Sequence, residues 1–575
     1  MSLSIFRVFL SSTFGDFQAE REKLRAEVWP RLEALCAAHN AFFHVVDLRW
    51  GISPSVATTH DTIKICLDEV IRCQQLSPKP KPNFLMLIGD RYGWRPPAVQ
   101  IPDVDFERIQ KWASTDDAKF LNYWYRRDDN AVPPIWCLKP RTDENVGHDA
   151  WGNVESQLTR ILHTAHEQLK LAPEQYYYSA THMEIVSGLL NLDGAREHIF
   201  SFNRELSGLP ETSHEGIARR FSDYLTDGSQ DPEAIRLRQV LKTEIAKVLP
   251  ENHIHTFQAT WTGADNNPIT TDHLDDYCSA IEQSLNNTII SELEELTKTT
   301  PLQEEEELEI QEIFLDDTGK HLIGRDEELN KIQVYLANEK PPLPLIIKAK
   351  GGAGKSALMA KANMLQEKKP IYRFIGASPR SWLPQTLLED LIKQIATAYE
   401  QEPPSLPEEG GIRKTAELFH EQLELATAEQ PLTIFIDAID QFNNTTPVQY
   451  SDIFPKQLPD NVRMIISVLE GKDSDQLEKL YPKAPIIQLE KLSPTVCGKI
   501  LDELLKEQNR KLTKIQRQTI LDKAKESGLP LWLVLTAPIA KKLSSWDTAP
   551  DDLPGDIKEL AIEHRGQGYT FDKAL

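Results

Sequence analysis

The stretch "LPLIIKAKGGAGKSALMAKA" at residues 343–362 joins an apolar run to a helical pattern through a glycine-rich turn. Such a turn lets backbone N–H groups approach a phosphate closely, while a helix N-terminus and a lysine add positive charge. The residues that supply these parts are Gly351, Gly352, Gly354, Lys355 and Ser356. The Ser356 hydroxyl is the expected magnesium ligand. The stretch therefore predicts a phosphate-binding loop for a nucleotide.

Ala349 stands where the strict spacing of such loops has its first glycine. Because Ala349 ends the apolar run, we expect strand geometry there, and a strand demands no positive φ. The three later glycines still allow the close backbone approach that a phosphate needs.

A second acidic element is expected on a later buried strand, because magnesium bound to phosphates is also held by a carboxylate. The run "LTIFIDAIDQF" at residues 432–442 supplies Asp437 as the magnesium-side carboxylate and Asp440 as the group that orients water. Gln441 follows, and an amide cannot act as a general base. Two acids so close together at a strand end can also form a turn cap, and this alternative stays open.

The elements that position these residues belong to a chain of 575 residues, which is too long for one core and predicts roughly three or more domains. Alternating strand and helix patterns form two blocks, which predicts parallel sheets with helices on both faces. The expected parts are an N-terminal module at 1–295 with an irregular insert at about 95–175, an acidic solvated linker at 296–318, an NTPase domain at 319–492, and a helical subdomain at 493–575.

In the first block, polar and aromatic residues follow the apolar strands, at the sheet edge where open α/β sheets bind ligands. They are Ser11, Ser12, Thr13, Asp47, Arg49, Trp50, Asp90, Arg91, Tyr92 and Trp94. They predict a pocket rim. In the alternative, Asp47–Arg49 and Asp90–Arg91 are ion pairs that hold loops.

Four segments in order resemble a STAND ATPase of the NACHT kind: "LIGRDEEL" at 322–329, "AKGGAGKS" at 349–356, "FIDAIDQ" at 435–441 and "SGLPLWLVL" at 527–535. The resemblance implies that Ile323, Gly324 and Arg325 flank the nucleoside and that Pro530 closes the pocket. Ser467 stands at the position of the polar sensor residue. The arginine that often follows in relatives is replaced by "VL", and the winged-helix and repeat domains that normally come next are not found before residue 575, so we expect either a fragment or a different sensor.

The first block resembles the TIR-like module that precedes NACHT ATPases in the telomerase-associated protein and nephrocystin-like family and in prokaryotic defence proteins. The matching segments are "RVFLSSTFGDFQAEREKL", "VDLRWGI", "ICLDEVIRC", "FLMLIGDRYGW" and "WYRRDDNAVPPIW". The resemblance implies that Glu184, five residues after Ser179, is a catalytic carboxylate for NAD cleavage, with Trp50 or Trp94 stacking on the base. Thr181 replaces the usual cysteine. A signalling or assembly module without catalysis is the alternative.

Composition narrows the function classes. The net charge of −23 comes without a long basic cluster, so no nucleic-acid partner is expected. No signal peptide and no apolar run of about 18 residues is found, which predicts a cytoplasmic protein away from membranes. The six cysteines, at 36, 66, 73, 137, 278 and 497, are scattered and predict reduced thiols.

Together these features predict an α/β multidomain protein: a flavodoxin/TIR-like parallel sheet with an insert, then a P-loop NTPase domain with a helical subdomain. We expect ADP and ATP with Mg²⁺ to act as a latch. Exchange of ADP for ATP, set off by an unknown trigger or protein partner, would lead to homo-oligomers that cluster the N-terminal module in innate or antiphage defence, with NAD as its substrate. In the alternative, the chain is an ATP-gated scaffold that only binds protein partners.

Overall fold

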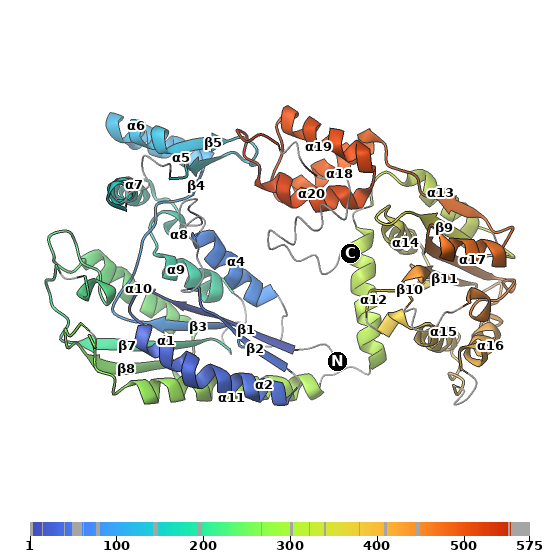
Figure 1. Ribbon diagram of the computed structural model, residues 1–575, viewed down its shortest axis with the longest axis horizontal. Coiled ribbons are helices and arrows are strands. Elements are labelled where there is room, and N and C mark those ends of the chain that lie inside the picture. The colour runs from blue at the N-terminus through green and yellow to red at the C-terminus, as the bar shows by residue number, and fades with distance from the viewer. Residues whose placement is uncertain are drawn as a thin grey trace. The chain divides into compact units, whose positions relative to one another are not determined.

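The computed structural model describes residues 4–13, 15–39, 41–48, 60, 62–75, 81–141, 148–192, 198–214, 216–265, 267–298, 303–320, 322–338, 341–378, 380–406, 411–442, 449–549 and 553. The chain divides into two compact units (Figure 1). Unit 1 comprises residues 1–128 and 133–299, and unit 2 comprises residues 129–132 and 300–575. Each unit is described by itself.

Unit 1 is built on a five-stranded sheet with the order β2-β1-β3-β7-β8. The strands are β1 (Ser4–Ser12), β2 (Ala41–Val46), β3 (Phe84–Ile88), β7 (Phe200–Ser207) and β8 (Ile254–Thr260). All neighbours run parallel, and Phe9 lies opposite both Val46 and Phe84 in the register. This is the flavodoxin-like strand order. The predicted parallel sheet is confirmed.

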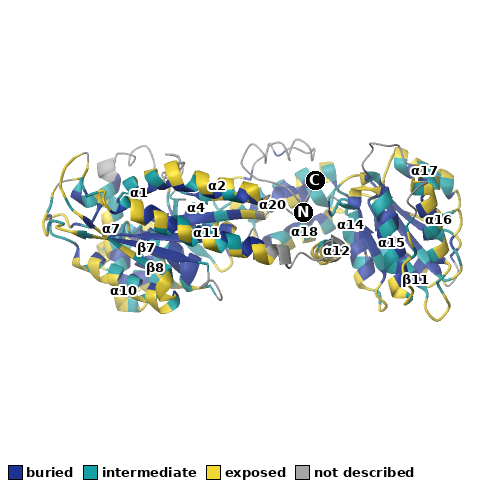
Figure 2. Cartoon of the chain, turned by 90° about the horizontal axis from the view of Figure 1, so that it is seen from below, coloured by how far each residue is buried: buried dark blue, intermediate teal, exposed yellow. Residues whose placement is uncertain are grey.

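Successive side chains of a strand point to opposite faces, so both faces of this sheet need a cover. One face packs on α1 (Gln18–Lys23), α2 (Trp29–Ala38) and α11 (Leu274–Lys298) through Phe6, Val8 and Leu10 of β1 (Figure 1). The other face packs through Phe9 on α4 (Thr62–Gln75), α9 (Ala180–Ile185) and α10 (Pro232–Val248). Figure 2 shows buried strands between helices whose outward sides are exposed. Two π-helical turns, Leu24–Val28 and Val186–Leu190, continue α1 and α9.

The insert, predicted as irregular over about 95–175, is a substructure with a core of its own. Its three strands pair antiparallel in the order β4-β6-β5. Its elements are β4 (Gln100–Pro102), α5 (Asp103–Trp112), α6 (Thr115–Trp124), β5 (Tyr125–Asp128), β6 (Ile135–Leu138), α7 (His148–Leu169) and α8 (Pro173–Tyr176). The aromatic side chains that made the sequence look irregular fill this core, as Phe106, Trp124 and Tyr125 do.

Unit 2 contains a second five-stranded parallel sheet, with the order β10-β11-β12-β9-β13. The strands are β9 (Leu345–Ala349), β10 (Ile371–Phe374), β11 (Leu432–Asp437), β12 (Val462–Leu469) and β13 (Ile486–Gln488). The surrounding helices are α13 (Asp326–Leu336), α14 (Lys355–Met364), α15 (Pro384–Ala398), α16 (Gly411–Leu423) and α17 (Lys472–Leu480). The short β13 is absent from the sequence prediction because three residues carry no periodicity.

The predicted helical subdomain consists of α18 (Pro494–Lys506), α19 (Lys514–Ser527) and α20 (Pro530–Lys542). Local signals set its helix ends. Thr513 caps α19 by accepting a hydrogen bond from the Gln516 N–H. Gly528 ends α19 in the left-handed region at φ 65°, and Pro530 occupies the first turn of α20. None of the helices in the described part of the chain is both long and apolar enough to cross a membrane.

The segment predicted as an acidic solvated linker at 296–318 behaves differently. Residues 303–319 form α12 (Gln303–Gly319), which packs on α14 and β10 of unit 2. Leu315 enters the hydrophobic core beside the P-loop, and Glu307 and Gln311 are buried. The interpretation as a solvated linker is therefore wrong for these residues. The many glutamates suggested full exposure to solvent, but one face of the helix is buried.

Candidate functional site

The glycine-rich turn lies between β9 and α14, as the sequence predicts. Gly352 and Gly354 have φ values of 76° and 90°, which favour glycine. Ala349 is fully buried in the strand, and its carbonyl accepts a hydrogen bond of 2.9 Å from the Glu470 N–H. Lys355 opens α14, whose first N–H groups have no partner within the helix. This arrangement provides backbone donors and a lysine for a phosphate group.

Asp437 ends β11 and is 2% exposed. Burial raises the pKa of its carboxyl, while hydrogen bonds from Ser356 and Ser467 and the charge of Lys355 act in the opposite direction. Ser467 belongs to β12, donates to Asp437 and accepts a hydrogen bond of 2.9 Å from the Ala438 N–H. The fold thus brings a hydroxyl, a lysine and a carboxylate from α14 and β11 together. These are the groups that suit Mg²⁺ on a nucleotide.

The residues after Asp437 form a tight turn that sets the position of the second acid. Ala438 adopts φ 56° and ψ 49°, a left-handed conformation that costs a residue with a side chain roughly 1–2 kcal/mol. Asp440 lies in the following 3₁₀ turn, Ile439–Gln441, and accepts a hydrogen bond of 2.7 Å from the Leu469 N–H. The alternative that these acids cap a turn therefore fits one contact of Asp440, its hydrogen bond from Leu469. Within the described residues, no group of three or more His, Cys, Asp or Glu side chains is arranged to hold a metal ion.

A cavity of about 400 Å³ opens beside the glycine-rich turn. Its wall includes Ile323 and Arg325 before α13, Gly354 of the turn, Ile500 of α18 and Pro530 of α20. These residues come from segments far apart in the sequence, and four of them are predicted site residues. Its volume falls in the range of small-molecule sites.

Arg325 holds the cavity wall together. The residue is 5% exposed. Its guanidinium donates to the Ala353 carbonyl at 3.2 Å and to the Glu490 carbonyl at 2.9 Å. It also pairs with Glu328 at 3.0 Å. Arg325 therefore ties the "GR" segment to the glycine-rich turn and to the chain that follows β13. Gly324, which does not line the cavity, has φ 73°, and a Cβ there would overlap the Val496 side chain.

The helical subdomain contacts the glycine-rich turn directly. The Leu531 N–H donates to the Gly352 carbonyl at 3.3 Å, and Pro530 Cγ lies 3.7 Å from the position of a Cβ at Gly354. The sequence motif around Pro530 therefore has two roles, as a helix start and as a part of the cavity wall.

In unit 1, Glu184 lies on α9 and is 6% exposed. Ser11 donates to its Oε2 at 2.7 Å, and burial raises the pKa of Glu184 to about 7. Ser179 caps α9 by accepting a hydrogen bond of 3.2 Å from the His182 N–H. The five-residue spacing of Ser179 and Glu184 therefore fits a helix cap followed by a residue of the same helix. Glu184 lines neither the cavity beside the glycine-rich turn nor the small hollow beside Trp94.

Trp94, expected beside Glu184, has other neighbours. Its Nε1 donates to Glu155 at 2.6 Å. Together with His60 and Trp151 it lines a separate hollow of about 80 Å³. The predicted residues Arg49 and Trp50 lie outside the described residues.

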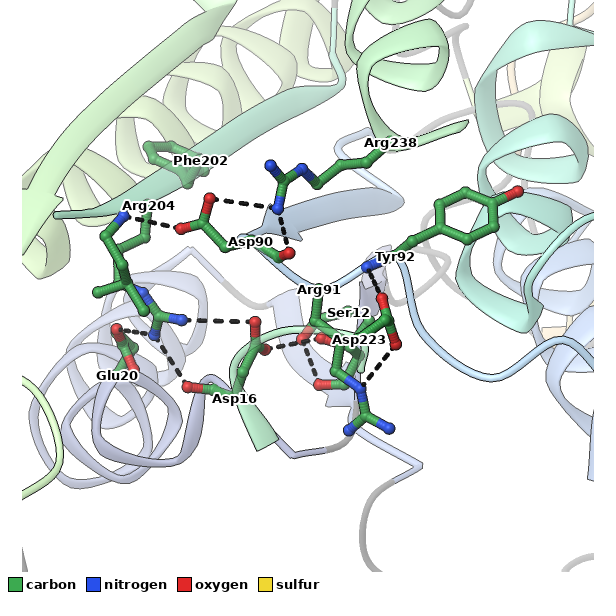
Figure 3. A network of polar contacts seen from close by, with 12 residues as sticks. Ser12, Asp16, Glu20, Asp90, Arg91, Tyr92, Phe202, Arg204, Asp223 and Arg238 are labelled. Atoms are coloured by element: carbon green, nitrogen blue, oxygen red, sulfur yellow. Dashed lines mark hydrogen bonds and ion pairs between the residues drawn. The ribbon is translucent and has the colours of Figure 1, made fainter. Parts of the chain in front are cut away.

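A buried ionic network occupies the carboxyl edge of the sheet in unit 1 (Figure 3). Arg204 is fully buried and donates to Glu20 at 2.7 Å and to the Asp16 carbonyl at 2.8 Å. Burial raises the pKa of Asp16 to about 6. Burial alone would also raise the pKa of Glu20, but Arg204 and His273 bring it below its usual value. No sequence motif marks Arg204, which lies inside the strand pattern of β7.

The acids at the strand ends hold loops, but with partners other than those expected. Asp90 accepts a hydrogen bond of 2.7 Å from the Leu206 N–H and pairs with Arg238 at 3.2 Å (Figure 3). Arg91 pairs with Asp223 at 3.5 Å, and Asp223 also accepts hydrogen bonds from the Tyr92 and Gly93 N–H groups. The expected Asp90–Arg91 pair is thus wrong.

At the neighbouring strand end, Asp47 pairs with Arg21 at 3.0 Å. Asp47 therefore has a partner on α1. Arg49, its partner in the ion-pair alternative, lies outside the described residues. Like Asp90 and Asp223, Asp47 is engaged by the unit's own arginines.

The ionisation of Glu184 predicts a pH dependence of stability. Its pKa is about 7 in the folded chain against an ordinary 4.5, so the native state binds more protons between these values and the free energy of unfolding falls as pH rises. The ionisation of Glu184 removes about 3 kcal/mol between pH 4.5 and pH 8. We expect Glu184→Gln to remove this part of the slope in denaturant unfolding. Parallel pH profiles for both proteins would contradict it, and the exposed Glu107→Gln is the control.

Comparison with known proteins gives the family context. The family model "Domain of unknown function (DUF4062)" matches residues 7–112. NACHT domain- and WD repeat-containing protein 1 of Mus musculus is 27% identical over 566 residues, which is 94% of this chain and 36% of that protein. Telomerase protein component 1 of Rattus norvegicus is 30% identical over 177 residues, which is 29% of this chain and 6% of that protein. The chain thus spans about a third of the first relative's length.

Among solved structures, a STAND protein with a tetratricopeptide repeat sensor from Pyrococcus horikoshii is 17% identical, with a TM-score of 0.26 over 44% of this chain and 33% of that one. The similarity to NACHT proteins extends over nearly the whole chain. It agrees with the parallel sheet and the glycine-rich turn of unit 2. The similarity to NACHT proteins supports a STAND/NACHT-type P-loop ATPase.

Proposed function

We propose that the chain binds ADP or ATP with Mg²⁺ in unit 2 and uses the nucleotide as a latch. The cavity of about 400 Å³ carries this proposal. It joins the phosphate-binding turn at Gly354 to an apolar wall formed by Ile323, Ile500 and Pro530. A nucleotide has a charged phosphate end and a flat, largely apolar base, and this site has a matching surface for each.

The chain's own groups would hold the phosphate end. Lys355 would pair with the outer phosphates, while the Ser356 hydroxyl and the Asp437 carboxylate would ligate Mg²⁺. Magnesium, when bound, neutralises the charge of the phosphate oxygens. Ser467 fixes the orientation of the Asp437 carboxylate by donating to it. Asp440 would orient the attacking water.

Hydrolysis at this site would be slow. One oxygen of Asp440 already accepts the Leu469 N–H at 2.7 Å, and Gln441 cannot take a proton. Slow hydrolysis suits a latch, because the bound nucleotide then sets the state of the protein for a long time. Contact of the helical subdomain with Gly352 gives the ADP state a means to stay closed. A trigger must favour the open state and its oligomers, since only a difference in affinity shifts an equilibrium.

The first test removes the phosphate-binding lysine. We expect Lys355→Ala to weaken ADP and ATP binding at least tenfold, because a hydrogen-bonded charge is lost. Mass spectrometry of nucleotide released from the purified protein, together with calorimetric titration, measures this. Lys361→Ala changes a lysine on the same helix away from the turn and should bind normally. If ADP still co-purifies with Lys355→Ala in equal amount, the assignment of the loop is wrong.

A second test compares two glycines. Gly324 and Gly411 both have positive φ, 73° and 60°, so an alanine at either carries similar backbone strain. Only at Gly324 would the added Cβ overlap a neighbour, Val496 of α18, whereas Gly411 has open space. We expect Gly324→Ala to weaken nucleotide binding severalfold more than Gly411→Ala, because it displaces the segment that carries Ile323 and Arg325. Equal affinities of the two variants for the nucleotide would show that this segment does not contribute to the site.

For unit 1, a role in binding protein partners is better supported than NAD cleavage. The polar groups at the carboxyl edge of its sheet bond to one another, and Glu184 is enclosed by Ser11 and its other neighbours. A role in innate or antiphage defence stays a prediction.

The experiment for unit 1 incubates the purified chain with NAD, with and without ATP, and measures nicotinamide by chromatography. We expect no release above the level of the Glu184→Gln protein, because Glu184 is buried and its Oε2 already accepts a hydrogen bond from Ser11. Nicotinamide release that Glu184→Gln abolishes would instead assign NAD-cleaving activity to unit 1.

A further inference from the structure

Helix α12 covers the open edge of the sheet in unit 2. β10 is an edge strand, and edge strands leave backbone groups unpaired. The side-chain amide of Gln311 takes the place of a neighbouring strand there: its Oε1 accepts the Phe374 N–H at 2.7 Å, and its Nε2 donates to the Phe374 carbonyl at 3.1 Å. Gln311 is fully buried, so both contacts are shielded from water.

The contacts of Gln311 continue into a buried chain of hydrogen bonds. Its Nε2 also donates to Glu307 Oε1 at 2.9 Å, and Glu307 Oε2 accepts from the Ser378 hydroxyl at 2.6 Å. Ser378 accepts from the Ser381 N–H at 3.1 Å, and the Ser381 hydroxyl accepts from the Gly376 N–H at 2.9 Å. Two residues of α12 thereby fix the whole segment that follows β10. Removing a member leaves a buried group unpaired.

This segment lies against the acidic strand end of the nucleotide site. Phe374 is opposite Asp437 in the register, and the Ile375 N–H donates to the Asp437 carbonyl at 3.2 Å. Gly376 has φ 93°, and a Cβ there would overlap the side-chain amide of Gln441. The backbone of Asp437 and the position of Gln441 therefore depend on how residues 374–376 are held.

The same helix also packs on the helix that carries Lys355. α12 contacts α14, and Gly319 at its end lies so close that a Cβ there would be 3.3 Å from the Ala360 backbone. Residues 299–302 alone separate α12 from α11, the last helix of unit 1. α12 is therefore the first helix of unit 2 that follows unit 1 along this part of the chain.

We infer that Gln311 and Glu307 are positioning residues that fix the end of β10 against Asp437 and Gln441, so that α12 controls whether the site hydrolyses its nucleotide. The hydrolytic part of this inference rests on the proposed function. Seating of α12 aligns the acidic strand end. Loss of its contacts to β10 loosens residues 374–376 and slows hydrolysis, while its packing on α14 and the phosphate-binding turn stay intact.

The experiment uses the full chain and three variants. Gln311→Met keeps the length of the side chain and removes both hydrogen bonds to Phe374. Ser378→Ala breaks the same chain of bonds from its other end without changing α12. Glu312→Gln is the matched control on α12, since its ion pair with Lys369 is exposed. Hydrogen exchange is followed in peptides covering residues 371–382 and 435–442, beside ATP affinity and single-turnover hydrolysis.

We expect faster exchange in both peptides for Gln311→Met and Ser378→Ala, at least a tenfold loss in hydrolysis rate, and less than a threefold change in ATP affinity. Glu312→Gln should match the unmodified protein in all three. Unchanged exchange at residues 435–442 in both variants would overturn the inference, as would an equal loss of affinity and rate. A failure of the proposed function gives a different result: the unmodified protein would bind no nucleotide, while the exchange measurement would still decide whether α12 positions the strand end.

Discussion

The carboxylate of Asp437 is the group on which unit 2 depends, because it is an acid buried at the end of an inner strand. A buried charge is costly unless hydrogen bonds and opposite charges compensate it. Ser467 on the neighbouring strand, Ser356 on α14 and the charge of Lys355 provide this compensation. The parallel order of β9, β11 and β12 brings these groups together, since it places the carboxyl ends of the strands at one edge. The left-handed turn at Ala438 is one cost of this arrangement.

The two units use the same edge of a parallel sheet in opposite ways. In unit 1 the buried Arg204 bonds to Glu20 and to Asp16, and the acids at the strand ends bond to loop N–H groups and to arginines (Figure 3). Most polar groups there are engaged by the protein itself. In unit 2 Ala353 and Gly354 of the glycine-rich turn line a cavity. This difference supports the proposal that unit 2 binds the nucleotide.

The periodicity of the sequence predicted much of the fold. Apolar runs bounded by helical patterns identified most strands of both sheets. The insert and α12 were misjudged for one physical reason. The aromatic or acidic composition of a segment reflects the segment alone. Its structure depends on the surface against which it packs. Gln311 is the sharpest case, because no motif marks a glutamine that completes a sheet edge.

By itself, the sequence located the glycine-rich turn and the two acids, because these depend on local spacing: a glycine turn between strand and helix, and carboxylates at a strand end. Only the tertiary structure decided which groups serve the site. It enclosed Glu184 beside Ser11 and gave the Trp94 indole N–H to Glu155. It also brought Ile323, Gly354 and Pro530 to one cavity. Contacts between residues hundreds of positions apart depend on how strands order themselves and how helices cover them, and local spacing carries no record of that order.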